Sequence, residues 1–224
     1  MCGRYSLAVD PAQVAARFRL TEAVEFQPEV NIAPGTDILA VATNREGRRT
    51  ARQLRWGLVP HWAEDPSIGN RMINARAEGI AEKPAFRRPF ERHRCLIPAD
   101  GFYEWQAREG LPKQVFRISK SDGQLLGLAG LWSVWHRGEP DELRTCTIIT
   151  TAANARMAEI HDRMPVVVAP EDEELWLDRD TPVAQLRALL HSLAPEQTQL
   201  TPVTLPPLPP SRPAEPPQQG TLFA

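Results

Sequence analysis

The chain has 224 residues, of which 42% are hydrophobic and 24% charged, and its formal net charge is −2. This is the composition of a globular domain, and the near-neutral charge argues against indiscriminate nucleic-acid binding. No apolar run is long enough to form a signal peptide or to cross a bilayer, so we expect no membrane partner. The three widely spaced cysteines argue against a disulfide framework or a structural zinc site and indicate the cytoplasm.

The first chemical feature along the chain is Cys2, because removal of Met1 would expose it as the N-terminal residue. Its α-amine would have a pKa of about 7.7–8.0, so part of it is unprotonated at neutral pH. Such an amine attacks aldehydes to give imines, and the neighbouring thiol can close the imine into a five-membered thiazolidine. The alternative is that Cys2 is a small apolar residue at a frayed terminus.

The elements that follow predict an α+β domain over residues 2–205. Asp10 and Pro11 predict a capped helix, and residues 38–43 and 51–58 flank a hairpin turn. We expect further strands at 94–98, 101–106, 114–119, 125–135, 143–151, 165–169 and 199–205, and helices at 152–160, 171–178 and 182–193. Short links between strands favour antiparallel pairing, in a curved sheet or open barrel with flanking helices.

Two segments depart from the average composition. Residues 71–94 hold seven basic and three acidic side chains, with Phe86 and Phe90 interleaved. This stretch fits either a phosphate-binding surface or a solvated charged face. The last 30 residues hold nine prolines, so we expect a disordered, proline-rich tail over residues 206–224.

Five short segments combine polar residues with aromatic or apolar ones: 31–36 (NIAPGT), 56–62 (WGLVPHW), 74–78 (NARAE), 99–105 (ADGFYEW) and 161–165 (HDRMP). Glu104 lies between Tyr103 and Trp105, which would desolvate it and suit it to proton transfer, unless it faces solvent on an alternating strand. By themselves, His161 and Asn74 are equally compatible with capping roles, and the tryptophans with core positions.

Taken in order after the starting MCGR, the last four segments resemble the SRAP family of abasic-site-processing proteins over roughly residues 2–170. The resemblance implies a single SRAP-type domain with a shallow basic groove for single-stranded DNA. Cys2, freed by self-catalysed removal of Met1, would form a thiazolidine with the aldehyde of an abasic site. The implied catalytic residues are Cys2, Asn74, Glu104 and His161. The implied DNA contacts are Arg4, Pro34, Trp62, Arg76, Trp105, Thr150 and Arg163.

The resemblance further implies a role in the bacterial DNA damage response, close to the nucleoid, as a monomer without metal or cofactor, and with lyase activity as a further possibility. Two features depart from the family pattern. Pro84 stands where some relatives have Arg, with Lys83, Arg87 or Arg88 as substitutes nearby, and the Val-Asn pattern of the family's usual final strand is not recognisable. At the end of the tail, Gln219, Leu222 and Phe223 resemble the peptide that docks repair proteins on the sliding clamp.

Two other functions use the same features. Class II glutamine amidotransferases also begin with Met-Cys-Gly, so Cys2 could serve an N-terminal-nucleophile amidohydrolase. A reversible single-stranded-DNA-binding module would use the basic and aromatic residues without covalent chemistry.

Overall fold

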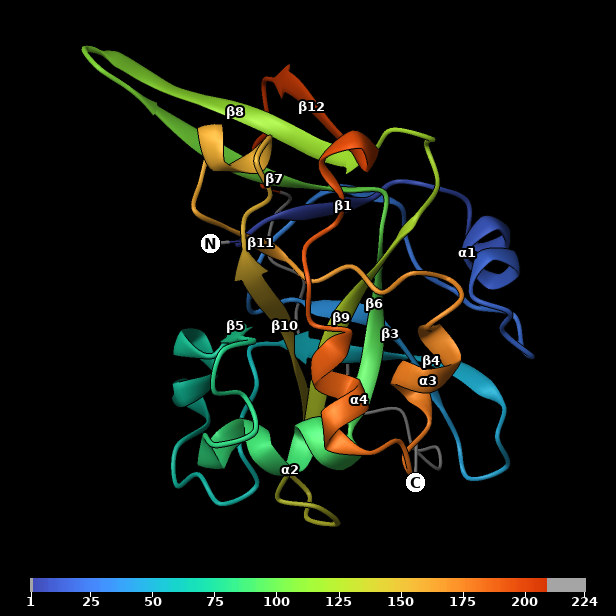
Figure 1. Ribbon diagram of the computed structural model, residues 1–224. Helices are drawn as coiled ribbons and strands as arrows, with labels where there is room; N and C mark the ends of the chain where they lie inside the picture. The colour runs from blue at the N-terminus through green and yellow to red at the C-terminus, as the bar shows by residue number, and fades with distance from the viewer. Residues whose placement is uncertain (1, 209–224) are drawn as a thin grey trace.

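Figure 1 shows the computed structural model of the chain, which describes residues 2–208. The strands are β1 (Tyr5–Leu7), β2 (Glu29–Ile32), β3 (Asp37–Thr43), β4 (Arg49–Trp56), β5 (Asn74–Arg76), β6 (Arg94–Ala99), β7 (Gly101–Arg108), β8 (Leu111–Lys120), β9 (Leu126–Trp135), β10 (Leu143–Ala152), β11 (Arg163–Pro165) and β12 (Thr198–Val203). The α-helices are α1 (Pro11–Arg17), α2 (Pro84–Arg92), α3 (Glu173–Leu177) and α4 (Val183–Ala188). Short 3-10 turns are η1 (Pro66–Arg71), η2 (Met157–Glu159) and η3 (Pro195–Gln197). Most of the predicted tail, including Gln219, Leu222 and Phe223, lies outside the described residues.

Five strands close into a barrel in the order β10-β4-β3-β6-β9 and back to β10. The β3–β4 pair is antiparallel, which confirms the predicted hairpin. The closing pair, β4 with β10, is parallel, and β5 also runs parallel to β10. The α+β class is confirmed, but the barrel is closed and not all of its pairs are antiparallel. A parallel pair needs a long crossover, and the chain between β4 and β10 supplies one.

A second sheet lies above the barrel in Figure 1, with the strand order β12-β8-β7-β1-β2. The predicted final strand is confirmed as β12, which pairs antiparallel with β8. Phe102 on β7 lies opposite Ile118 on β8, and both belong to the main apolar core. Because side chains alternate along a strand, Glu104 shares the core-facing side with Phe102, whereas Trp105 shares the outer side with Val115.

Helix α1 begins as predicted, with the Asp10 side chain accepting a hydrogen bond from the N–H of Ala12 at 2.7 Å. A buried carboxylate, Glu173, ties the helices to the barrel. It pairs with Arg17 at 2.8 Å and with Arg49 at 2.7 Å. Two guanidinium partners compensate the desolvation of this carboxylate, so removing either one would destabilise the α1–α3 side of the molecule.

The helix predicted at 152–160 is wrong. Ala152 still belongs to β10 and lies opposite Arg163 on β11. The side chain of Asn154 then accepts a hydrogen bond from the N–H of Met157 at 2.9 Å, and only the short turn η2 follows. The helices predicted at 171–178 and 182–193 exist in shorter form as α3 and α4. The strand predicted at 165–169 is largely wrong, because β11 ends at Pro165 and beyond it in that range only Val167 forms an isolated bridge, with Leu128.

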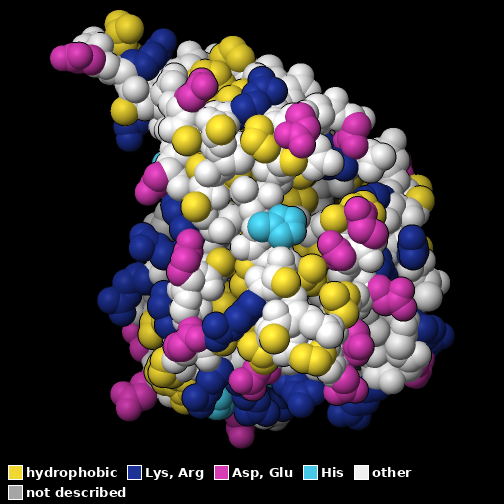
Figure 2. Space-filling view, viewed as in Figure 1, with side chains coloured by type: hydrophobic (Ala, Val, Ile, Leu, Met, Phe, Trp, Pro, Cys, Tyr) yellow, Lys and Arg dark blue, Asp and Glu magenta, His cyan; other side chains and the backbone are white. Residues whose placement is uncertain are grey.

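The basic stretch 71–94 is divided between two places. Its first part forms β5 beside β10, and its second part forms α2 at the bottom of the view in Figure 1. Figure 2 shows Lys and Arg side chains along this lower edge, interspersed with acidic ones. Arg92 there pairs with Asp180 at 3.1 Å. Helix α2 therefore presents a mixed charged surface, and Arg76 on β5 is the exposed cation closest in sequence to Asn74.

Candidate active site

Cys2 is fully buried and directly precedes the segment that leads into β1, a strand that lies between β7 and β2 in the second sheet. Its thiol donates a weak hydrogen bond to the carbonyl of Arg4 at 3.9 Å. Its own carbonyl accepts a hydrogen bond from the Nδ2 of Asn74 at 2.8 Å. Asn74 is placed for this contact by β5, where it lies opposite Ile148 on β10. One strand of the barrel region therefore holds the backbone of Cys2 in place.

Glu104 is the carboxylate of this site and is only 3% exposed. Burial raises the pKa of Glu104, and the nearby His161 opposes that rise. Burial likewise raises the pKa of the Cys2 thiol, and the negative charge of Glu104 raises it further. Glu104 therefore lies close to both Cys2 and His161, although the three residues come from distant parts of the sequence.

His161 lies between η2 and β11, and its side chain is 28% exposed. Two groups meet at its Nδ1: the N–H of Arg163 at 3.0 Å and the carboxylate of Asp162 at 2.8 Å. In the neutral ring, the N–H of Arg163 donates to Nδ1, which leaves the proton on Nε2. The Asp162 carboxylate can accept a hydrogen bond at this position only from an Nδ1 that carries a proton.

Arg163 is held in place by an acidic residue that the sequence analysis did not select. Its guanidinium forms a two-bond ion pair with Glu78, at 2.6 and 2.9 Å, and also donates to the carbonyl of Thr150 at 2.6 Å. The hydrogen bond from Arg163 lowers the pKa of Glu78, despite a small opposing effect of burial. Thr150 is fully buried, so its carbonyl is a fixed hydrogen-bond acceptor for Arg163. Glu78 belongs to the NARAE segment, which is the only signal that could have singled it out.

Other predicted DNA contacts lie on the surface. Trp62 is 52% exposed, in the loop after β4. That loop is anchored by Trp135, whose indole N–H donates to the carbonyl of Ala63 at 2.7 Å. Pro34 is half-buried in the turn between β2 and β3, and Arg76 is exposed on β5. Of these three side chains, Trp62 is thus carried by a loop that a tryptophan side chain anchors.

Arg4 and Trp105 lie on the outer side of the second sheet. The guanidinium of Arg4 donates to the side-chain oxygen of Asn31 at 3.1 Å, and the Asn31 amide donates to the carbonyl of Pro206 at 2.7 Å. Asn31 is buried and was not selected from the sequence, although the NIAPGT segment begins with it. The structure therefore groups Cys2, Asn74, Glu104 and His161 together, and it separates Arg4 and Trp105 onto an adjoining surface.

No cluster of His, Cys, Asp and Glu side chains suited to a metal ion is found among residues 2–208. Within the same range, no helix is long and apolar enough to cross a membrane.

A family model, described as SOS response associated peptidase (SRAP), matches residues 1–205. The chain belongs to the SRAP family. The abasic site processing protein YoqW of Bacillus subtilis is 42% identical over 194 residues, covering 85% of this SRAP chain and 86% of YoqW. The abasic site processing protein YedK of Escherichia coli is 33% identical over 189 residues, covering 80% and 81% of the two chains.

Two solved structures agree with the fold of this SRAP protein. A protein from Bacteroides thetaiotaomicron matches with a TM-score of 0.81 and 28% identity, covering 91% of this chain and 92% of that one. A phage-related protein from Bordetella bronchiseptica matches with a TM-score of 0.73 and 30% identity, covering 90% and 94%. The family model extends to residue 205, so the family domain includes β12.

Proposed function

We propose that this SRAP protein processes abasic sites in single-stranded DNA by a covalent thiazolidine crosslink between Cys2 and the sugar aldehyde. Its relatives YoqW and YedK are named abasic site processing proteins. The observation that carries the proposal is the surroundings of Cys2. Asn74 holds its carbonyl at 2.8 Å, and the buried Glu104 is close enough to raise the pKa of its thiol.

The proposed reaction begins with hydrolysis of the peptide bond between Met1 and Cys2, which the family's peptidase description also suggests. The freed amine adds to the aldehyde carbon, and the resulting carbinolamine loses water to give an imine. The thiol sulfur then bonds to the imine carbon, while the thiol proton passes to the nitrogen. Hydrolysis of the peptide bond consumes one water and imine formation releases one, and neither an oxidant nor a reductant is needed.

Glu104 and His161 would move the protons. Because burial raises the pKa of the Cys2 thiol, the thiol is neutral at physiological pH and needs a base when the ring closes. Burial also raises the pKa of Glu104, which makes its carboxylate a stronger base than a solvent-exposed one. His161 would donate a proton to the sugar ring oxygen and so open the abasic sugar to its aldehyde. Strand cleavage, which depends on the open sugar, would also depend on this step.

Non-covalent affinity would come from surfaces next to this centre. Trp62 and Pro34 would pack on bases, and Arg76 would contact the phosphate backbone. An abasic nucleotide has no base to unstack, so it enters a buried site at a lower free-energy cost than an ordinary nucleotide. Docking on a sliding clamp through Gln219, Leu222 and Phe223 stays a separate prediction.

The test is a denaturing gel of the protein mixed with a single-stranded oligonucleotide that contains one abasic site. The expected result is a band of protein plus oligonucleotide. A version with extra residues before Cys2 should form no such band, because its Cys2 nitrogen is a non-nucleophilic amide. A reversible DNA binder would leave no band with either version, and an amidohydrolase would instead release ammonia from glutamine.

A further inference from the structure

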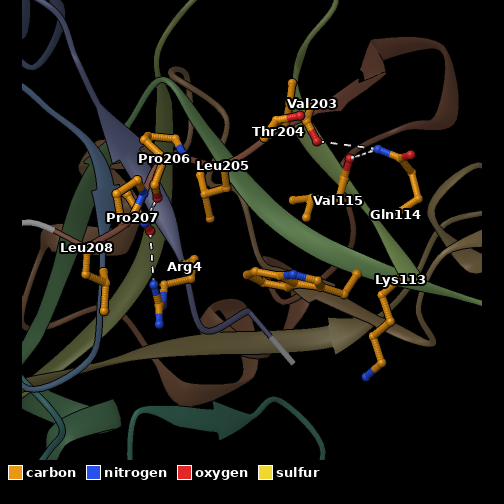
Figure 3. Close-up of a pocket in the computed structure, with 12 residues that line it drawn as sticks. Arg4, Lys113, Gln114, Val115, Val203, Thr204, Leu205, Pro206, Pro207 and Leu208 are labelled. Atoms are coloured by element: carbon orange, nitrogen blue, oxygen red, sulfur yellow. Dashed lines mark hydrogen bonds between the residues drawn. The ribbon is translucent and has the colours of Figure 1, made fainter.

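A cavity of about 440 Å³ lies on the outer side of the second sheet, next to the proposed crosslinking site. Figure 3 shows it between β8 and the chain segment that follows β12. This volume is within the roughly 300–1,000 Å³ typical of small-ligand sites. The described residues that line it are Arg4, Asn31, Trp105, Lys113, Gln114, Val115 and the segment from Val203 to Leu208.

The lining has the chemistry of a nucleotide site. Arg4 and Lys113 supply two cations, and none of the described lining residues is acidic. Trp105 supplies an aromatic face, and the register of the sheet places Val115 opposite Trp105 and Val203 opposite Val115. A base prefers such an apolar and aromatic surface, whereas its phosphate prefers the cations.

The segment from Thr204 to Leu208, here called the C-terminal wall, forms one side of the cavity without filling it (Figure 3). It is fixed by the hydrogen bond from Asn31 to the carbonyl of Pro206 at 2.7 Å, and the same Asn31 side chain accepts from Arg4 at 3.1 Å. The side-chain amide of Asn31 therefore positions both the C-terminal wall and the guanidinium of Arg4. The cavity remains open with the wall in place, so the wall completes a site.

The cavity is also close to the nucleophile. The carbonyl of Arg4 accepts the hydrogen bond from the Cys2 thiol, while the side chain of Arg4 lines the cavity. Two residues of chain span at most about 7 Å, so a strand whose abasic sugar reaches Cys2 brings a neighbouring nucleotide to this cavity.

We propose that the cavity binds one unpaired nucleotide on one side of the abasic site, with Lys113 contacting its phosphate and the C-terminal wall packing against its base. This inference rests on the proposed function, since it assigns a neighbour of the same lesion. It adds Lys113, Gln114 and the C-terminal wall to the residues that bind DNA, with Asn31 as a positioning residue.

The test uses a reduced abasic analogue, which has no aldehyde, in two oligonucleotides that extend on only one side of the lesion. Binding is measured by fluorescence anisotropy. Lys113→Glu should weaken binding of one oligonucleotide by about 5-fold, the upper range for an exposed ion pair, and leave the other unchanged. The slope of log affinity against log salt should fall by about 0.7, as expected for loss of one phosphate contact on a single strand. Arg45→Glu, at the exposed β3–β4 turn, makes the same charge change and should affect neither.

Two truncations test the wall. A chain ending at Val203 should lose affinity for the oligonucleotide whose binding Lys113→Glu weakens. A chain ending at Leu208 should keep that affinity. Tighter binding by the shorter chain would mean that the segment obstructs DNA, and equal losses with both oligonucleotides would mean a general charge effect. Either result overturns the proposal. If wild-type protein still crosslinks aldehyde-containing DNA, only this subsite fails; if it neither binds nor crosslinks, the proposed function fails.

Discussion

The proposed crosslinking centre and the surfaces proposed to bind DNA are built in different ways. Asn74 and Glu104 are fixed by strand register, opposite Ile148 and Phe116, and Glu104 is buried. Trp62, by contrast, is more than half exposed on a loop, and Arg76 is exposed at a strand end. Reactivity would therefore depend on the alignment of two sheets, whereas affinity would depend on side chains that can be replaced without disturbing either sheet. Substitutions in the two regions should separate bond formation from binding.

The largest expected effect is at Cys2. Cys2→Ala should abolish the stable adduct, because the thiazolidine needs the thiol, and should leave the dissociation constant for the reduced abasic analogue within about 2-fold, since no phosphate contact is lost. Denaturing gels and anisotropy measure the two quantities. A stable adduct from Cys2→Ala at the wild-type yield would remove Cys2 from the mechanism.

Glu104→Gln should slow adduct formation by about 10²–10⁴-fold, the usual contribution of a general acid–base group. The wild-type rate should fall as the pH drops through the pKa of Glu104, which burial raises above its ordinary value, because protonation removes the base. The variant should lose this acid limb and keep the one set by the α-amine, near pH 7.7–8.0 as a rough value. Single-turnover rates across pH decide the point; an unchanged profile would assign Glu104 a structural role.

Trp62→Ala should weaken binding of the reduced analogue by about 1–3 kcal/mol, the value of one base–aromatic stack, with no change in the crosslinking rate at saturating DNA. Trp62→Phe, which keeps an aromatic face, is the matched control and should recover most of the affinity. If Trp62→Ala lowers the crosslinking rate at saturating DNA and leaves the affinity for the reduced analogue unchanged, the division between the two regions is wrong.

The smallest effect is expected at Glu78. Glu78→Gln removes the charge that pairs with Arg163 and makes the guanidinium more available to a phosphate, so DNA affinity should rise by about 2- to 5-fold at low salt. The gain should vanish in the Glu78→Gln, Arg163→Gln double variant. Weaker binding by Glu78→Gln would instead mean that the ion pair holds Arg163 in its DNA-binding position.

The sequence predicted the members of the centre better than their surroundings. Local sequence signals were enough to locate the helix cap at Asp10, the β3–β4 hairpin and most strands, because these depend on local pattern. The helix at 152–160 was wrong because pairing with β11 extends β10 through Ala152, which is a tertiary effect. Glu78 and Asn31 were missed for the same reason: their partners, Arg163 and Pro206, lie 85 and 175 residues away.

The central claim is that the α-amine and thiol of Cys2 together capture the aldehyde, and the intact mass of the adduct tests it most directly. The protein is mixed with an oligonucleotide carrying one abasic site and analysed before and after borohydride treatment. The account predicts a mass equal to the protein without Met1 plus the oligonucleotide less one water, unchanged by borohydride because the thiazolidine has no imine left to reduce. An adduct that retains Met1, or one that gains two hydrogens on reduction, would contradict it.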